Sequence, residues 1–302
     1  MAPRSSVLLC SLLCLCAWPA SAQPAPLGEG FTVVASPQHA AFPTHGAPTV
    51  IVHAPPGFDA HAKLDLVVFL HGYSGCVSVL MGHGPSRCSP TSEPQPGWDL
   101  GARHDDAHTN TLFIVPQLAF MKRSGRAGAF ARDGVFRAFL EELLRDTLVK
   151  ELGGSRTLAD VASLTLVAHS AGYETTLAIL QHGRVSELVR SVVLFDALYG
   201  EADAYADYIE AHAGSGLRVI ALHLGGAATY RNDRHLYRRL KRRLGTERVA
   251  WTATQPELEA ALAALAEHPI VIGAATPPHR LVPEHHLAQV LRALRPPPSA
   301  AR

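Results

Sequence analysis

The sequence has 302 residues, of which 47% are apolar and 18% charged, with 27 Lys and Arg against 26 Asp and Glu. This apolar content excludes a disordered chain, and the lack of a glycine repeat excludes a collagen-like one. A net charge of +1 supplies no field that would hold a polyanion, so nucleic acid is excluded as an expected partner. The chain is expected to be globular.

Residues 1–22 have the pattern of a secretory signal peptide. Arg4 precedes an apolar run from Val7 to Trp18, and Ala20-Ser21-Ala22 forms a small-residue cleavage site. The apolar run is shorter than a membrane-spanning helix requires. We therefore expect cleavage after Ala22, a secreted or periplasmic location, and no stable insertion into a membrane.

Removal of the signal would leave Cys76 and Cys88 as the two remaining cysteines. Disulfides persist in the compartments that secreted proteins enter. A bridge here would close a loop of roughly a dozen residues, which the chain-entropy model credits with about 3 kcal/mol of stability. We expect the bridge, and two free thiols are the alternative if the side chains face apart.

After a Pro- and Gly-rich lead-in over 23–30, short β-type segments alternate with helical ones. Several β-type segments are nearly continuous apolar runs, as in parallel strands that are covered on both faces. The expected strands are Phe31–Val34, Thr49–His53, Leu64–Leu70, Thr111–Val115, Leu164–Ala168, Ser191–Phe195, Val219–Leu224, Val249–Thr252 and Ile270–Ile272.

The segments between the strands have helical periodicity. The expected helices are Val135–Leu152, Ala171–His182, Ala202–Ala213, Arg234–Leu244, Glu257–Glu267 and His285–Leu294. Such alternation predicts a single α/β domain over 23–302, with a mostly parallel central sheet and helices on both faces. The segments 73–108 and 117–133 have no clear element and are expected to be functional or mobile loops.

Ser170 stands in a pattern that is typical of a catalytic nucleophile. Residues 164–172 read LTLVAHSAG, so an apolar strand passes through small residues into a helix. The small residues permit a sharp turn that lifts a serine hydroxyl above the edge of the sheet. The following helix would point its free amides at the same place. We interpret Ser170 as the nucleophile, and a serine that only caps the helix is the alternative.

From about Thr49 to Leu294, the chain resembles the α/β-hydrolase superfamily. Residues 67–75, VVFLHGYSG, resemble the strand and His-Gly turn that supplies part of the oxyanion hole in that superfamily. The resemblance implies that the backbone N–H groups of Tyr73 and Ala171 bind the oxyanion. It also implies the chain order Ser, acid, His. A secreted hydrolase with this turn is similar to the serine esterase and polyester-depolymerase-like branches.

The general base is expected in the loop after the last strand, because a serine hydroxyl needs an adjacent imidazole to take its proton. The candidates are His279, His285 and His286. His279 lies in the loop before the last helix, whereas the other two histidines open that helix. We choose His279, with His285 as the next candidate.

The acid that orients the imidazole needs a buried position near the carboxyl ends of the strands. Asp196 ends the apolar run SVVLF, where a buried carboxylate is costly without a partner. The superfamily more often places the acid one strand later, but residues 217–226 contain no carboxylate. We choose Asp196, and Asp233 is the alternative.

Residues 104–108, HDDAH, combine side-chain types that bind metal ions, and His83 lies upstream. Their spacing matches no zinc or calcium pattern, so we interpret His104 and His108 as members of a polar loop near the rim of the pocket. We expect neither a metal nor an organic cofactor.

Together these residues predict a secreted serine hydrolase that cleaves small or polymeric carboxylic esters through an acyl-enzyme. The fold does not select the reaction, so an amidase, a peptidase or an acyltransferase with the same residues is an alternative. A non-catalytic secreted binding protein on the same scaffold is the alternative from a different class. The sequence does not indicate an oligomeric state.

Overall fold

The computed structural model describes residues 28–42, 49–119, 126–226 and 228–295. The expected signal peptide over 1–22 lies outside these residues. Within the described ranges, none of the helices combines the length and the apolar character needed to cross a lipid bilayer.

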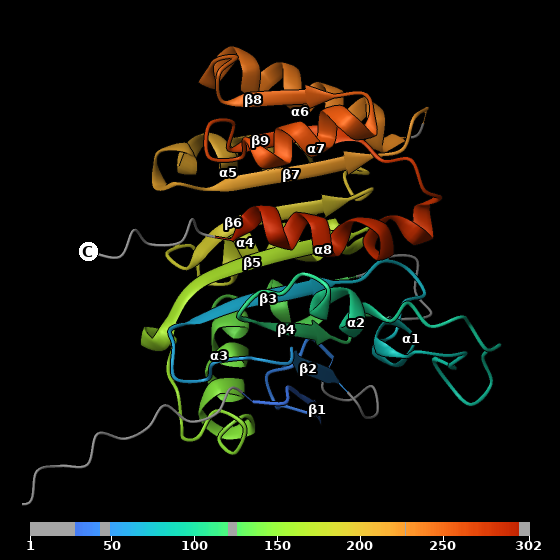
Figure 1. The fold of residues 1–302 in the computed structure, drawn as a ribbon, viewed down its shortest axis with the longest axis vertical. Helices are drawn as coiled ribbons and strands as arrows, with labels where there is room; N and C mark the ends of the chain where they lie inside the picture. The colour runs from blue at the N-terminus through green and yellow to red at the C-terminus, as the bar shows by residue number, and fades with distance from the viewer. Residues whose placement is uncertain (1–27, 43–48, 120–125, 227, 296–302) are drawn as a thin grey trace, which may run out of the picture.

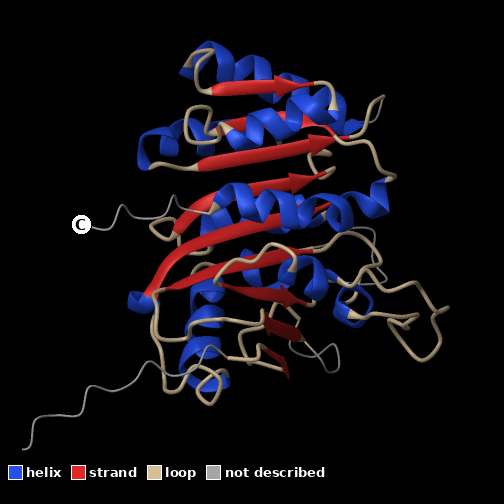
Figure 2. Cartoon of the chain, in the orientation of Figure 1, coloured by secondary structure: helices blue, strands red, loops and turns tan. Residues whose placement is uncertain are grey.

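In the described part of the chain, nine strands form one twisted, mixed sheet (Figures 1 and 2). Its strand order is β1-β2-β4-β3-β5-β6-β7-β9-β8. The pairs β1–β2 and β2–β4 are antiparallel, and all other neighbouring pairs are parallel. The strands are β1 (Phe31–Ala35), β2 (Val50–Ala54), β3 (Leu64–Leu70), β4 (Thr111–Pro116), β5 (Val161–His169), β6 (Val189–Phe195), β7 (Arg218–His223), β8 (Val249–Thr252) and β9 (Ile270–Ala274).

Eight α-helices accompany this sheet within the same ranges. They are α1 (Val77–Met81), α2 (Leu100–Asp105), α3 (Val135–Glu142), α4 (Gly172–His182), α5 (Ala202–His212), α6 (Ala228–Leu244), α7 (Gln255–Ala263) and α8 (Val282–Leu294). Short 3-10 segments are η1 (Gly128–Ala131), η3 (Leu158–Asp160), η4 (Ala213–Ser215) and η5 (His279–Leu281), and η2 (Leu143–Thr147) is a π-helical turn.

Two hydrophobic cores cover the two faces of the sheet. Along β3, Leu66, Val68 and Leu70 belong to one core, and Val67 and Phe69 belong to the other. The first core includes buried side chains of α3, α4, α5 and α6, whereas the second includes those of α1, α2, α7 and α8. Figure 1 shows α7 and α8 crossing the same side of the sheet. The expected fold class is therefore confirmed, with helices on both faces of a mostly parallel sheet.

The helix expected over Val135–Leu152 is wrong in its second half. The α-helix ends at Glu142, and a π-helical turn follows. Leu143 and Leu144 remain buried in this turn. The apolar stripe shows which side chains face the core but does not reveal the change in hydrogen bonding, so the sequence does not mark this break.

The helix expected over Arg234–Leu244 begins earlier, at Ala228. Its first turns bury Thr229 and Asp233 rather than apolar side chains, which hides the helical period there. The segment 73–108, for which no element was expected, contains the short helices α1 and α2. Buried side chains of both helices belong to the second core, so they attach the segment to that face of the sheet.

Candidate active site

The carboxyl ends of the parallel strands bring distant residues to one edge of the sheet. Ser170 follows β5, Asp196 follows β6, and Leu224 follows β7. The segment after β9 carries His279, and the segment after β3 begins with His71. This edge is where ligands bind in open α/β sheets.

Ser170 occupies a sharp turn between β5 and α4. Its φ is +54°, a left-handed value that a residue other than glycine adopts at an energetic cost. The turn requires small neighbours: a Cβ on Gly72 would lie 2.5 Å from the Cβ of Ser170, and one on Gly172 would lie 2.0 Å from the Leu70 carbonyl oxygen. This close approach explains the small residues around the serine.

Ser170 and His279 line the same pocket, which has a volume of about 170 Å³. Tyr73, Trp98 and Arg280 also line this pocket. The serine hydroxyl and the imidazole therefore share one solvent-accessible space.

Asp196 forms a hydrogen bond with the imidazole of His279. Its Oδ2 lies 2.5 Å from Nδ1 of His279. Its Oδ1 accepts hydrogen bonds from the Thr229 hydroxyl at 2.5 Å and from the Leu224 N–H at 3.2 Å. Because Asp196 is 1% exposed, these donors take the place of water around the carboxylate.

The donors also set the charge of Asp196. Burial by itself raises the pKa of this carboxyl, but the hydrogen bonds from His279, Thr229 and Leu224 hold the pKa below its usual value. Asp196 is consequently ionised at neutral pH, the form that can stabilise a protonated imidazole.

The alternative candidates lie in other environments. Asp233 lies 3.2 Å from Nδ1 of a different histidine, His223, and burial raises the pKa of Asp233 to about 6. On α8, His285 is exposed and His286 is buried, and within the described ranges neither donates to Asp196. The structure thus places Ser170 and His279 at one pocket and joins His279 to Asp196, whereas Asp233, His285 and His286 are not part of this arrangement.

The amides expected to form the oxyanion hole are available. Among the described residues, the backbone N–H groups of Tyr73 and Ala171 donate to no hydrogen-bond acceptor. Tyr73 follows Gly72, which contacts Ser170, and Ala171 is the N-cap residue of α4. Free amides at the start of a helix favour negative charge.

No protein-family model matches the chain, and no curated protein is similar enough in sequence to count as a relative. Solved structures do match. One is a mutant of the feruloyl esterase module from Clostridium thermocellum complexed with sinapinate, at 13% identity, with a TM-score of 0.52 over 90% of this chain and 89% of that chain. A structure of a protein designated FAE matches over the same shares at 14% identity, with a TM-score of 0.51.

The chain has the α/β-hydrolase fold. At these identities the likeness shows the fold alone, so the roles of the site residues depend on the geometry of this chain. Within this α/β-hydrolase fold, two buried histidines for which the sequence predicts no role, His71 and His169, support the site.

His71 supports the loop that carries Tyr73. Its Nδ1–H donates to the Gly72 carbonyl at 2.9 Å, and its Nε2 accepts from the Leu118 N–H at 2.9 Å. Burial lowers the pKa of His71 to about 4, so the ring is neutral at neutral pH. The histidine of the His-Gly turn could have been singled out, but its partner Leu118 lies in a segment without sequence signals.

His169 contacts the backbone of His279. Its Nε2–H donates to the backbone carbonyl of His279 at 3.0 Å, and its ring meets the ring of Trp98 edge-to-face at 5.1 Å. Burial lowers the pKa of His169 to about 3, so it stays neutral. His169 directly precedes Ser170, but the sequence alone does not show which backbone group its side chain reaches.

Cys76 and Cys88 form the expected disulfide, with their Cα atoms 5.5 Å apart. Cys76 is the N-cap residue of α1, and the Sγ of Cys88 lies 3.8 Å from the Ser74 carbonyl oxygen. The bridge therefore closes a loop directly beside Tyr73, and it restrains one wall of the pocket.

Proposed function

We propose that this chain is a serine hydrolase that cleaves carboxylic esters, with residues 23–302 acting as one catalytic domain. The observation that carries the proposal is the Asp196–His279 hydrogen bond at the pocket that Ser170 lines. The strained turn at Ser170 is a suitable position for a nucleophile. The free amides of Tyr73 and Ala171 are suited to bind an oxyanion.

The chemistry follows from these positions. With Nδ1–H donated to Asp196, Nε2 of His279 is the atom that accepts the Ser170 proton. The serine oxygen attacks the ester carbonyl, and the N–H groups of Tyr73 and Ala171 bind the oxyanion. The imidazolium then gives its proton to the departing alcohol, which leaves an acyl-serine. Water then attacks the acyl-serine with the help of the same groups, which releases the carboxylic acid and restores Ser170.

Two considerations favour an ester as the substrate. One structural neighbour is named as a feruloyl esterase module. An alkoxide is also a better leaving group than an amine anion, so ester cleavage makes the smaller demand on proton transfer. Amide hydrolysis and acyl transfer remain the alternatives that use the same residues.

A secreted or periplasmic location is part of the proposal. The signal-like residues 1–22 and the Cys76–Cys88 disulfide support it, because disulfides persist in oxidising compartments. The intact mass of protein recovered outside the cytoplasm should correspond to a chain that begins at Gln23. A mass that retains residues 1–22 would refute cleavage after Ala22.

A fluorophosphonate probe tests the catalytic proposal directly, because it labels only an activated serine. The parent protein should be labelled, and a folded Ser170→Ala variant should not. Equal labelling of the two proteins would reject Ser170, and a parent that neither reacts nor hydrolyses esters would favour the binding-protein alternative. The kcat/KM values for an ester and an anilide of the same acyl group separate esterase from amidase activity.

A further inference from the structure

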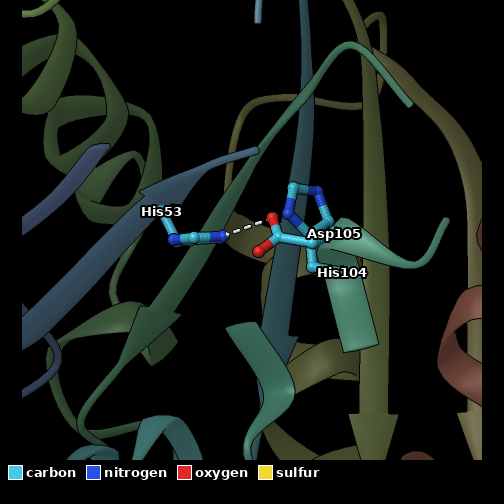
Figure 3. Close-up of side chains that lie close together, drawn as sticks. All are labelled: His53, His104 and Asp105. Atoms are coloured by element: carbon cyan, nitrogen blue, oxygen red, sulfur yellow. Dashed lines mark hydrogen bonds and ion pairs between the residues drawn. The ribbon is translucent and has the colours of Figure 1, made fainter. Parts of the chain in front are cut away.

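A second cluster of polar side chains lies outside the pocket, between β2 and α2 (Figure 3). It contains His53 from β2 and the neighbouring residues His104 and Asp105 from α2. One ligand atom from each of these residues lies within 4.8 Å of the other two. We propose that His53, His104 and Asp105 bind a Zn²⁺ ion.

The cluster contains a buried nitrogen atom that lacks a hydrogen-bond partner among the described residues. His104 is fully buried, and its Nε2 is paired with the Thr111 hydroxyl at 2.6 Å. Its Nδ1 is also buried, and within the described ranges it has no hydrogen-bond partner. A buried polar atom without a partner is costly, and such atoms are rare in native proteins. A metal ion would give this lone pair a partner.

Hydrogen bonds outside the cluster orient both imidazole rings. His53 has its Nδ1 2.9 Å from the Thr32 hydroxyl and its Nε2 2.8 Å from a carboxylate oxygen of Asp105. Each imidazole therefore has one nitrogen at a threonine hydroxyl, which leaves the other nitrogen for the cluster. Metal-binding histidines are held in this way, because the outer hydrogen bond fixes the tautomer and the direction of the ring.

The surroundings fix the orientation of the imidazole of His104. Its ring stacks on Phe113, with centroids 5.1 Å apart and planes inclined by 17°. Thr111 lies on β4, so the sheet holds the outer hydrogen bond of this ring.

The donor set selects the ion. Two imidazoles with one carboxylate suit Zn²⁺, whereas Ca²⁺ and Mg²⁺ prefer all-oxygen sites. Zn²⁺ lies about 2.0–2.2 Å from such ligands, so two ligand atoms can be at most roughly 4.3 Å apart. The cluster must close slightly around the ion. Asp105, with 35% of its side chain exposed, has the freedom to move.

A bound ion would tie α2 to β2. The chain enters α2 from Trp98, whose side chain lines the pocket of Ser170. Three protein ligands leave one position for water, but the cluster does not line that pocket. The ion is therefore expected to stabilise the wall of the pocket rather than to take part in the reaction of Ser170.

Metal retention by the purified protein tests the proposal. After incubation with excess Zn²⁺ and gel filtration, we expect the parent to retain one equivalent of zinc by mass spectrometry, and to melt at a higher temperature than the chelator-treated protein. The variants His53→Gln and Asp105→Asn should lose both effects while keeping the circular dichroism of the parent. Both replaced side chains are partly exposed and lie outside the core.

The matched control is His83→Ala, because His83 forms an exposed pair with Asp99 at 2.7 Å without a second imidazole. This variant should retain zinc as the parent does. Co²⁺ substitution in the parent should give the visible absorption of a tetrahedral site, a readout that does not depend on any variant. A parent that retains no zinc, or equal retention by the parent and Asp105→Asn, would overturn the proposal.

Discussion

The carboxylate of Asp196 lies 2.5 Å from Nδ1 of His279, although 83 residues separate the two in the sequence. Asp196 follows β6, and His279 follows β9, with β7 between these strands in the sheet. The contact therefore depends on the parallel sheet, which brings both loops to one edge. Thr229 of α6 fixes the other carboxylate oxygen, so the acid is held from two sides.

Replacement of Asp196 tests its assignment as the acid. Asp196→Asn keeps the shape of the side chain but cannot stabilise an imidazolium, so we expect kcat to fall by about 10⁴-fold. Ester hydrolysis under saturating substrate measures this. The matched control is Asp233→Asn, which changes the other buried carboxylate and should leave kcat close to that of the parent. The reverse result would transfer the role to Asp233.

Asp233 should make stability depend on pH. Burial raises the pKa of Asp233 from 3.8 to about 6, against the opposing hydrogen bond from His223. Because this pKa is higher in the folded state, the contribution of Asp233 to stability is complete below pH 3.8 and is lost as the pH rises through about 6. An amide resembles the neutral carboxyl, so Asp233→Asn should be more stable than the parent by roughly 1–3 kcal/mol near neutral pH.

Urea unfolding of both proteins across this pH range measures the difference. The two curves should converge below pH 3.8, where the parent carboxyl is protonated in both states. A difference that stays constant with pH would show that the variant acts through packing and not through ionisation.

The order of the strands and helices and the turn at Ser170 could be predicted from the sequence, because both depend on local patterns of residues. Apolar runs predict the buried strands, and small residues around Ser170 predict a sharp turn. Segments that bury polar side chains could not be predicted in this way. The start of α6 buries Thr229 and Asp233, and the helical period is hidden there.

Contacts between segments that lack helical or strand periodicity also could not be predicted from the sequence. The link between His71 and Leu118 joins two loops, and the cluster of His53 with Asp105 joins a strand to a short helix. The interpretation of His104 and His108 as members of one polar loop is wrong, because His104 is buried in α2 whereas His108 is exposed. The structure brings His53 to Asp105 instead. Side-chain direction in a short helix depends on the sheet beneath it, which local spacing does not encode.

Activity should require glycine at position 72, because this residue lies very close to Ser170. A Cβ at this position would lie 2.5 Å from the Cβ of Ser170, so Gly72→Ala must displace the turn. We expect kcat/KM to fall by about 10²-fold, because small displacements of a reacting group have large effects. The control is Gly84→Ala, where an added Cβ meets nothing within 4 Å. Equal activities of the two variants would contradict a close contact between Gly72 and Ser170.

The Cys76–Cys88 disulfide should contribute to stability through the loop that it closes. The cysteines are 12 residues apart, and the double variant Cys76→Ala/Cys88→Ala should lose about 3 kcal/mol of unfolding free energy. Urea unfolding with and without a reductant measures this effect. The reductant should destabilise the parent and leave the double variant unchanged. If the parent is insensitive to full reduction, the bridge makes no such contribution.

His169 should act as a positioning residue for the base, because its Nε2–H donates to the backbone carbonyl of His279 at 3.0 Å. His169→Phe keeps a ring against Trp98 and removes this donor. We expect kcat to fall by roughly fivefold with KM unchanged, since one hydrogen bond contributes about 1 kcal/mol to holding His279 in place. His169→Gln offers a new N–H donor and should recover part of the loss. A merely structural role would lower the melting temperature of both variants equally and leave their kcat values alike.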